Sequence, residues 1–205
     1  MFYKADEPHG LPFNPFKAIV APRPVGWIST LSKAGIANLA PYSFFNGVCD
    51  VPPMVMFSSG NVKDSMRNAM DSDEFTFNYA SNAMRDVMNV SSGGYPPEES
   101  EFEIAGIEMV AGETVSCPRV AGAPAAMECK VIEIVTPTLL NGEKSPYHMI
   151  IGQVTGVHID DAMITDGRFD MKKADPLMRC GYRDYTTIAE IFEMDRPVGA
   201  GDMKT

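Results

Sequence analysis

Residues 21–46 read APRPVGWISTLSKAGIANLAPYSFFN, and this stretch contains the pattern that decides the fold. Two short runs of apolar and β-prone residues flank the sequence Ser-Lys-Ala-Gly at residues 32–35, where the glycine can adopt a positive φ in a turn. The pattern predicts a β-hairpin, and therefore an antiparallel pair of strands near the start of the chain.

Two more strands are expected downstream of this hairpin. Residues 54–59 (MVMFSS) form an apolar run that follows a pair of prolines, and proline cannot donate a hydrogen bond to a central ladder. Residues 74–79 (EFTFNY) place their three aromatic side chains on one side of an extended segment. Both segments are therefore predicted to be buried strands.

Short helices are expected at three places. Residues 62–70 place three apolar side chains at i, i+4 and i+8, residues 84–88 place three at i, i+3 and i+4, and residues 188–192 suggest a last short helix. The second helix should end near the SSGG sequence at residues 91–94. The apolar faces of the first two helices are Val62, Met66 and Met70, and then Met84, Val87 and Met88.

The back half of the chain returns to strands. Residues 127–135 and 149–159 are rich in β-branched side chains, and Asn141-Gly142 between them is a turn signal within a longer connection. Residues 95–124 are expected to be mostly loop. Because strands outnumber helices without regular alternation, we expect residues 1–205 to form one mainly β domain, a closed antiparallel barrel with a few peripheral helices.

Composition excludes several classes of partner. Seventeen Lys and Arg residues against twenty-seven Asp and Glu residues give a net charge of −10, which disfavours binding to nucleic acid and anionic membranes. No apolar run approaches the length of a membrane span, and the first ten residues are polar, so a cytoplasmic location is expected. The four cysteines show no metal-binding spacing and are expected to be reduced, mostly packed thiols.

Familiar catalytic motifs are missing from the chain. It contains no GxGxxG, GxxxxGK[ST], GxSxG or HExxH sequence, and only three histidines. We therefore expect no metal site and no catalytic side chain, and a bound cofactor would supply the reactivity.

Small hydroxyl-bearing and amide-bearing residues gather at the ends of the expected strands, as a flavin mononucleotide (FMN) site would require. Each has a more ordinary interpretation. Ser29 and Thr30 could be exposed strand positions, and Lys63 and Asp64 could form a solvated first helical turn with Asn61 as its N-cap. The single tryptophan, Trp27, is expected in the core.

Three sequences in residues 22–69 carry a specific resemblance: PRPVGWIST…G…NLAPYSFFN, PPMVMFSS and KDSMRNA. In this order they resemble the signature of the flavin-reductase-like, FMN-binding split β-barrel family, which includes flavoredoxin. The back half is similar to the family more loosely, through MECKVIEI, IIGQVTGVHIDD and PLMRCGYRDYTTIAEIFEMDRP.

The resemblance implies an antiparallel split β-barrel of Greek-key type that forms a homodimer, with FMN near the subunit interface. It implies flavin reduction by NADH or NADPH in many members, whereas others only carry electrons to a partner protein. Two alternatives to a reductase therefore remain: an electron carrier or FMN-binding module without nicotinamide turnover, and a structural barrel that has lost its flavin.

The resemblance also assigns candidate site residues. Those expected at the FMN phosphate or ribityl chain are Ser29, Thr30, Lys63, Asp64 and Ser65. Those expected along the ring and in the same cavity are Ala40, Pro41, Tyr42, Ser43, Asn46 and Ser58. Two tail residues, Arg179 and Tyr185, are expected to reach the flavin from the other subunit.

Two further residues have open roles. Cys49 occupies a position where the family more often has serine, and we interpret it as a small packed side chain, with a redox role as the alternative. His158 is interpreted as structural or loop-anchoring, with proton transfer as the alternative.

Overall fold

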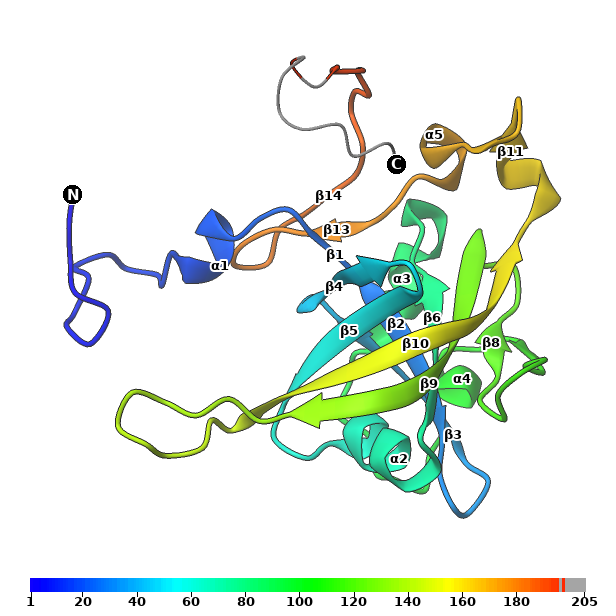
Figure 1. Cartoon of the computed structure of the whole chain (residues 1–205), viewed down its shortest axis with the longest axis horizontal. Helices are drawn as coiled ribbons and strands as arrows, with labels where there is room; N and C mark the ends of the chain where they lie inside the picture. Colours follow the sequence, from blue (N-terminus) through cyan, green and yellow to red (C-terminus); the bar gives the residue numbers. More distant parts are fainter. Residues whose placement is uncertain (196, 198–205) are drawn as a thin grey trace.

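The computed structural model describes residues 1–195 and 197, and its main element is a curled antiparallel sheet of seven strands (Figure 1). The strand order is β3-β2-β6-β9-β10-β5-β4. The expected mainly β fold with few helices is confirmed, but the sheet is open between its two edge strands and is not the closed barrel that the strand pattern predicted. The strands are β2 (Gly26–Leu31), β3 (Ala37–Tyr42), β4 (Phe45–Asp50), β5 (Pro53–Gly60), β6 (Glu74–Tyr79), β9 (Ala125–Val135) and β10 (Tyr147–Ile159).

The edge strands β3 and β4 follow one another along the chain but are not paired with each other. Residues 43–44 bend between them, at the place where the curled sheet stays open. The opening of the split barrel is therefore bordered by the sequence that was expected to hold a flavin ring.

Short helices and strands surround this sheet. The helices are α1 (Phe16–Ile19), α2 (Asp64–Ser72), α3 (Arg85–Val90), α4 (Glu101–Ile104) and α5 (Met171–Ala174), with 3-10 turns at Asn82–Met84 and Asp161–Met163. The short strands are β1 (Arg23–Pro24), β7 (Met109–Val110), β8 (Arg119–Val120), β11 (Ile164–Thr165), β12 (Arg168–Phe169), β13 (Met178–Arg179) and β14 (Tyr185–Thr186). None of the described helices has the length and apolar character needed to span a membrane.

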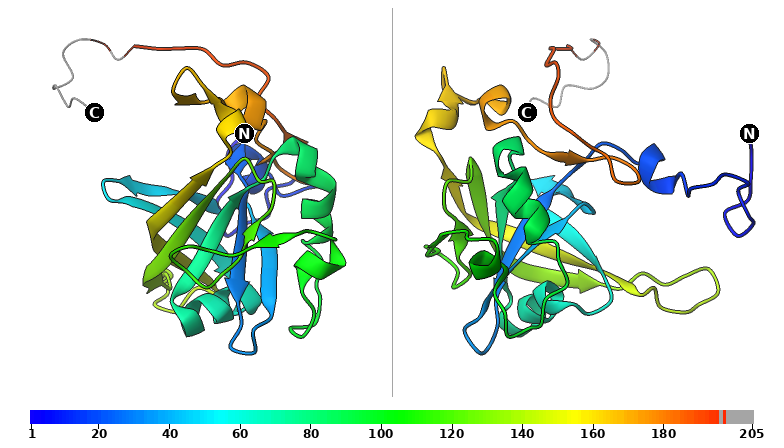
Figure 2. Two further views of the ribbon diagram at one scale, coloured as in Figure 1. Left: turned by 90° about the vertical axis from the view of Figure 1, so that its right-hand side faces the viewer. Right: turned by 180° about the vertical axis from the view of Figure 1, so that it is seen from behind.

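Helix α2 and the small sheet β1-β13-β14 lie toward opposite ends of the barrel, as the side and rear views show (Figure 2). Strand β3 runs from the end of the barrel near α2 toward the end near the small sheet. At its start, Asn38 contacts Ser65 in α2. At its other end, Pro41 and the following Ser43 line a pocket with Arg179 of β13. This strand therefore connects two regions that contain candidate site residues.

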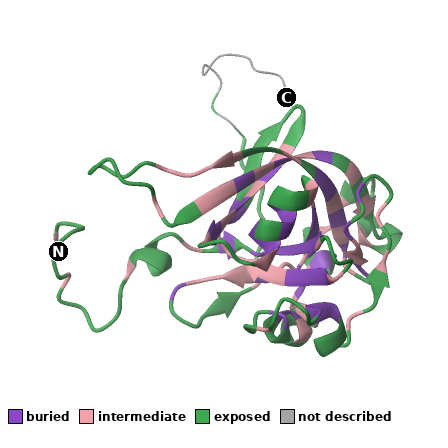
Figure 3. Ribbon diagram, turned by 90° about the horizontal axis from the view of Figure 1, so that it is seen from below, coloured by how far each residue is buried: buried purple, intermediate pink, exposed green. Residues whose placement is uncertain are grey.

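Two apolar clusters form the core, which appears as the buried centre of the barrel in Figure 3. Alternation along β2 directs Ile28 into the first cluster, inside the barrel, and Trp27 into the second, under α3 and α4. The indole N–H of Trp27 donates to Ser91 Oγ at 2.9 Å, which satisfies its polar atom in the core. The expected core position of Trp27 is confirmed.

Most expected elements are present, with two corrections. The hairpin and the four strands are confirmed, and a helix covers residues 85–90. However, α2 begins at Asp64, and it buries Ser65, Met66, Asn68 and Ala69, whereas Val62 and Met70 are exposed.

The expected helix at residues 188–192 is wrong, because this segment has no regular structure. Ile191 and Phe192 are exposed, and so short a helix needs packing to be stable. In the expected loop region, a short helix, α4, was missed.

Candidate functional site

A buried polar cluster lies beside the start of β3. Asn38 Oδ1 accepts hydrogen bonds from Ser65 Oγ at 2.6 Å and from Thr30 Oγ1 at 3.3 Å. Asn68 Nδ2 donates to Thr30 Oγ1 at 3.1 Å, and Asn38 Nδ2 donates to both carboxylate oxygens of Glu101 at 2.9 Å. We call these five residues the amide cluster. It joins two site residues that the resemblance assigned, Thr30 and Ser65, to three that it did not assign.

Glu101 is the unexpected charge in this cluster. It is 6% exposed, and its Oε2 also accepts from the backbone N–H of Leu39 at 2.9 Å. Burial raises the pKa of Glu101, although the hydrogen bonds from Leu39 and Asn38 favour the ionised form and offset part of this effect. The residue fixes both the backbone and a side chain of β3.

The N-terminus of α2 adjoins the amide cluster and has properties suited to an anion. Lys63 is the N-cap residue and provides no side-chain cap, so the first-turn amides of Asp64 and Ser65 have no helical acceptor. The Lys63 ammonium is exposed and pairs with no carboxylate of the described residues. Asp64 pairs with Arg67 at 2.7 Å. The structure thus brings the expected residues Lys63, Asp64 and Ser65 together.

Tyr42 points into the barrel. Its ring lies 4.8 Å from the ring of Phe57, between centroids. Burial raises the pKa of Tyr42, and hydrogen bonding with Ser65 and Ser59 lowers it in part. The Tyr42 side chain therefore belongs to the core and contacts the same end of α2, so only its backbone could face a ligand at the barrel opening.

A pocket of about 510 Å³ lies at the other end of β3, and we call it the cationic pocket. Among the described residues, no carboxylate lines it. Its lining residues are Lys17, Arg23, Val25, Pro41, Ser43, Asn89, Ser92, Arg179, Tyr182, Arg183 and Tyr185.

Four expected site residues meet in the cationic pocket: Pro41, Ser43, Arg179 and Tyr185. The guanidinium of Arg179 lies 4.3 Å from the centre of the Tyr185 ring. Both tail residues share this pocket with Ser43 of their own chain, whereas the resemblance implied an approach from the other subunit.

Arg23 forms the buried wall of the cationic pocket. Its Nη1 donates to the carbonyls of Lys17 and Val20, and its Nη2 donates to the carbonyl of Cys180 at 3.0 Å. The side chain is 6% exposed, its Nε has no hydrogen-bond partner, and it pairs with no described carboxylate. The guanidinium lies 5.7 Å from the centre of the Phe44 ring, and within the described part of the chain this buried positive charge has no counter-ion.

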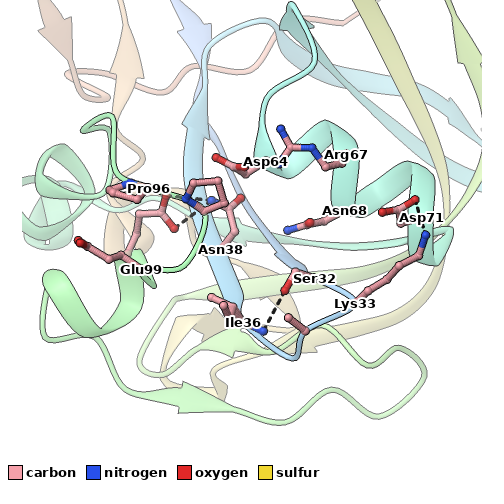
Figure 4. A pocket seen from close by; sticks show the side chains of 13 residues that line it. Ser32, Lys33, Ile36, Asn38, Asp64, Arg67, Asn68, Asp71, Pro96 and Glu99 are labelled. Atoms are coloured by element: carbon pink, nitrogen blue, oxygen red, sulfur yellow. Dashed lines mark hydrogen bonds and ion pairs between the residues drawn. The ribbon is translucent and has the colours of Figure 1, made fainter.

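A different pocket, of about 210 Å³, lies next to α2 and the hairpin turn (Figure 4). Its two cations are already paired, Lys33 with Asp71 at 2.8 Å and Arg67 with Asp64. Glu99 and Glu101 add two more carboxylates to its lining. This pocket shares Asn38, Asp64, Asn68 and Glu101 with the amide cluster and the first turn of α2, but Lys63 is not among its lining residues. Because its four acids outnumber its two paired cations, a phosphate at this end of the barrel would have to lie at Lys63 and the first-turn amides, outside this pocket.

The remaining expected residues lie outside these sites. Ser29 is fully buried on the face of β2 opposite Thr30, and its hydroxyl donates to the carbonyl of Pro118 at 2.5 Å. Asn46 is exposed on β4 and Ser58 is half-buried on β5. Ala40 is half-buried in β3, between the two regions.

Cys49 is exposed, so the interpretation as a packed side chain is wrong. Its Sγ donates to the carbonyl of Val51 at 3.3 Å. His158 Nε2 lies 2.6 Å from Oε1 of the fully buried Glu128. Glu128 also accepts from the backbone N–H groups of Glu113 and Thr114, so His158 anchors a buried carboxylate.

Comparisons with known proteins agree with this fold. The family model described as "Flavin reductase like domain" matches residues 20–180. Protein BH2278 of Halalkalibacterium halodurans is 37% identical over 183 residues, which cover 87% of this chain and 87% of that protein.

Two solved structures show how widely the fold is shared. Nitrilotriacetate monooxygenase component B from Bacillus cereus aligns with a TM-score of 0.86 and 27% identity, covering 95% of this chain and 98% of that one. Flavoredoxin of Desulfovibrio vulgaris (Miyazaki F) aligns with a TM-score of 0.76 and 21% identity, covering 98% of this chain and 100% of that one. The second likeness concerns the fold alone.

Proposed function

This chain belongs to the flavin reductase-like domain family, and from that premise we propose that it binds FMN and passes hydride or electrons from NADH or NADPH to an acceptor. The observation that carries the proposal is the uncapped N-terminus of α2 beside the unpaired Lys63. In a protein of net charge −10, a helix N-terminus with free amides and a lysine is a specific attraction for a phosphate.

The residues present fit a flavin with a single phosphate. Lys63 and the amides of Asp64 and Ser65 would hold the phosphate through charge-assisted hydrogen bonds. At a strand rise of about 3.3 Å per residue, Tyr42 lies roughly 13 Å from Asn38 along β3. The strand therefore extends from the proposed phosphate site to the barrel opening, where a second part of the flavin could be contacted. There, Ser43 lies in the bend between β3 and β4, outside both ladders, where its N–H can serve a ligand.

When bound, the flavin would supply the redox chemistry by accepting a hydride, which is two electrons and one proton, and releasing electrons to an acceptor. The chain's own residues position and shield it. Pro41 contributes no N–H and stiffens the strand at the opening, and the buried Tyr42 ring ties that strand to Phe57. No catalytic side chain is required by this scheme.

A test of the proposed function begins with the purified protein. We expect it to take up FMN with a visible flavin spectrum, and NADH or NADPH to bleach that spectrum without oxygen. Bleaching by dithionite but not by either nicotinamide would support the electron carrier instead. A protein that takes up no FMN would contradict both and favour a structural barrel.

A homodimer is part of the same proposal. The outer face of β4, β5 and β10 presents a patch of exposed and half-buried apolar side chains, and we call it the apolar face: Val48, Val51, Met54, Met56, Met149 and Ile151. The N-terminal segment before α1 and the loop between β9 and β10 project on one side of the barrel (Figures 1 and 3). Both carry exposed apolar residues, among them Phe13 and Leu140, which a second copy of the chain could cover.

A further inference from the structure

The cationic pocket holds more positive charge than one flavin phosphate needs. Lys17, Arg23, Arg179 and Arg183 line it, and none of them pairs with a described carboxylate. The FMN phosphate already has a complementary site at the N-terminus of α2, beside the start of β3. The four cations lie beside the end of β3, with Pro41 and Ser43. The proposed phosphate site at α2 therefore leaves these four cations free for a second anion.

Arg23 gives the physical reason for expecting a ligand here. A buried guanidinium whose donors meet only carbonyl oxygens lacks the negative charge that would offset its lost hydration. Among the residues that the structure describes, its Nε has no hydrogen-bond partner. Because the backbone contacts of Lys17 and Cys180 fix this side chain, the charge is held in place before any ligand arrives.

We infer that the cationic pocket binds the phosphates of the nicotinamide donor and selects NADPH over NADH. This inference rests on the proposed function. NADPH carries two pyrophosphate charges and a 2′-phosphate of about −1.5 to −2, which together match the four cations, whereas NADH lacks the 2′-phosphate. Dinucleotide sites that select NADH commonly hold the ribose 2′-hydroxyl with a carboxylate, and those for NADPH use arginine.

The residues that line the cationic pocket agree with the arginine-rich arrangement that selects NADPH. The described residues that line it include three arginines and no acid. Arg179 already stacks on Tyr185, so a planar surface is available to a purine base. Ser43 borders both this pocket and the bend at the barrel opening, which would place the donor next to the flavin ring.

The arrangement of the pocket depends on a close contact between α1 and the turn after β13. A Cβ built on Gly181 would lie 2.4 Å from Cβ of Ala18, so only glycine allows this approach. The contact brings Lys17 of α1 toward Arg179 and Arg183 of the tail. Together with Arg23 of β1, these side chains line one cavity. Such a preformed pocket favours selective binding because little reorganisation is needed.

The experiment uses probes that carry no hydride: adenosine 2′,5′-bisphosphate and 5′-AMP, titrated calorimetrically into the full-length protein saturated with FMN. We expect the bisphosphate to bind at least tenfold more tightly than 5′-AMP. Arg183→Gln and Lys17→Gln replace exposed side chains, so the fold should persist, and each should reduce this ratio at least threefold. Lys144→Gln, in the loop between β9 and β10, is the control for the loss of one charge.

Rapid-mixing measurements of flavin bleaching should show the same preference for NADPH over NADH, weakened in both pocket variants. Equal binding of the two probes by the wild-type protein, or an unchanged ratio in both variants, would overturn the inference. A chain that takes up no FMN would contradict the proposed function, whereas one that binds FMN without discriminating between the probes would overturn only the choice of NADPH.

Discussion

The side-chain amide of Asn38 donates to both carboxylate oxygens of Glu101, at 2.9 Å each. This pair fixes the orientation of the Asn38 amide, so its Oδ1 faces the hydroxyl of Ser65 in the first turn of α2. Glu101 also binds the backbone of Leu39. A carboxylate from a separate helix therefore orders both the strand and the helix end that together form the proposed phosphate site.

Replacing Glu101 tests this coupling. In Glu101→Gln, an amide oxygen at the Oε2 position can still accept from the backbone N–H of Leu39, but the new NH2 group at the Oε1 position would face the NH2 of Asn38, which places two buried donors against each other. We expect the free energy of unfolding to fall by about 2–3 kcal/mol and FMN affinity to fall as well. Urea denaturation and FMN titration measure the two effects. Glu99→Gln, an exposed acid just before α4, is the control, and equal behaviour of the two variants would contradict the role of Glu101.

Lys63 is the cation of the proposed phosphate site. We expect Lys63→Ala to weaken FMN binding by about 1.5–3 kcal/mol, because one charge-assisted contact with a dianion is lost. The effect should shrink as salt is added, since Lys63 is exposed. Fluorescence titration of FMN at low and high ionic strength is the measurement, with Lys144→Ala as the control. Unchanged affinity at low salt would remove Lys63 from the site.

The buried carboxylate of Glu128 should make the free energy of unfolding depend on pH in the acidic range. Burial opposes its ionisation, but hydrogen bonds from Thr114, the Glu113 amide and His158 outweigh this and lower its pKa to about 2. Because this is below the value of the unfolded chain, the stabilisation is complete above pH about 4.5 and is lost as pH falls toward 2. The group should then contribute on the order of 3 kcal/mol.

The variant Glu128→Gln isolates this contribution. We expect it to be less stable than the wild type near neutral pH, and the difference between the two proteins to shrink between pH 5 and pH 2. Denaturation at each pH gives the two curves. Glu133→Gln, an exposed position on the same strand, controls for a change in net charge, and parallel curves for the wild type and Glu128→Gln would show that Glu128 does not titrate in this window.

The apolar face predicts the oligomeric state. We expect a dimer at micromolar concentration by light scattering, and Met56→Glu to dissociate it, because a charge would be buried at the centre of the contact. Lys172→Glu, at an exposed position in α5 that pairs with no described carboxylate, changes the charge in the same direction away from this face and should leave the dimer intact. A monomeric wild-type protein that binds FMN tightly would exclude a role for the partner in the site.

Local patterns predicted the sheet well, because alternation and turn residues act within a few positions of one another. The hairpin around Gly35 and the strand at residues 74–79 needed no information from elsewhere in the chain. The buried face of α2 differs from the one that the apolar spacing predicted, because its packing partners come from β2 and β3. Ser65 and Asn68 are therefore buried in place of Val62 and Met70.

The unexpected site residues depend on contacts across long stretches of sequence. Glu101 and Asn38 are separated by 63 positions, and Arg23 reaches the carbonyl of Cys180 across 157. Glu101 stands in an acidic, loop-rich segment that resembles a solvated surface, and nothing local indicates its burial. Arg23 lies in the sequence that carries the family resemblance, but its missing counter-ion becomes visible only when the pocket is formed.

The last prediction concerns how the flavin ring is recognised. Ser43 lies in the bend between β3 and β4 and borders the cationic pocket, so its amide is outside both ladders. If the backbone recognises the ring, Ser43→Ala keeps the donor and should change FMN affinity less than tenfold, or about 1.4 kcal/mol. Ser43→Pro removes the donor and should abolish binding. The extended Tyr42 suits a residue that precedes proline, so this variant should still fold.

Calorimetric titration of the wild type and both variants with FMN compares the two modes of recognition. Circular dichroism of Ser43→Pro must first show an intact sheet, so that lost binding reports the missing amide. Full loss of binding in Ser43→Ala, together with near-normal binding in a folded Ser43→Pro, would show that the hydroxyl recognises the flavin. Because the Tyr42 side chain is directed into the barrel against Phe57, backbone amides of the bend, that of Ser43 among them, are left to recognise the ring.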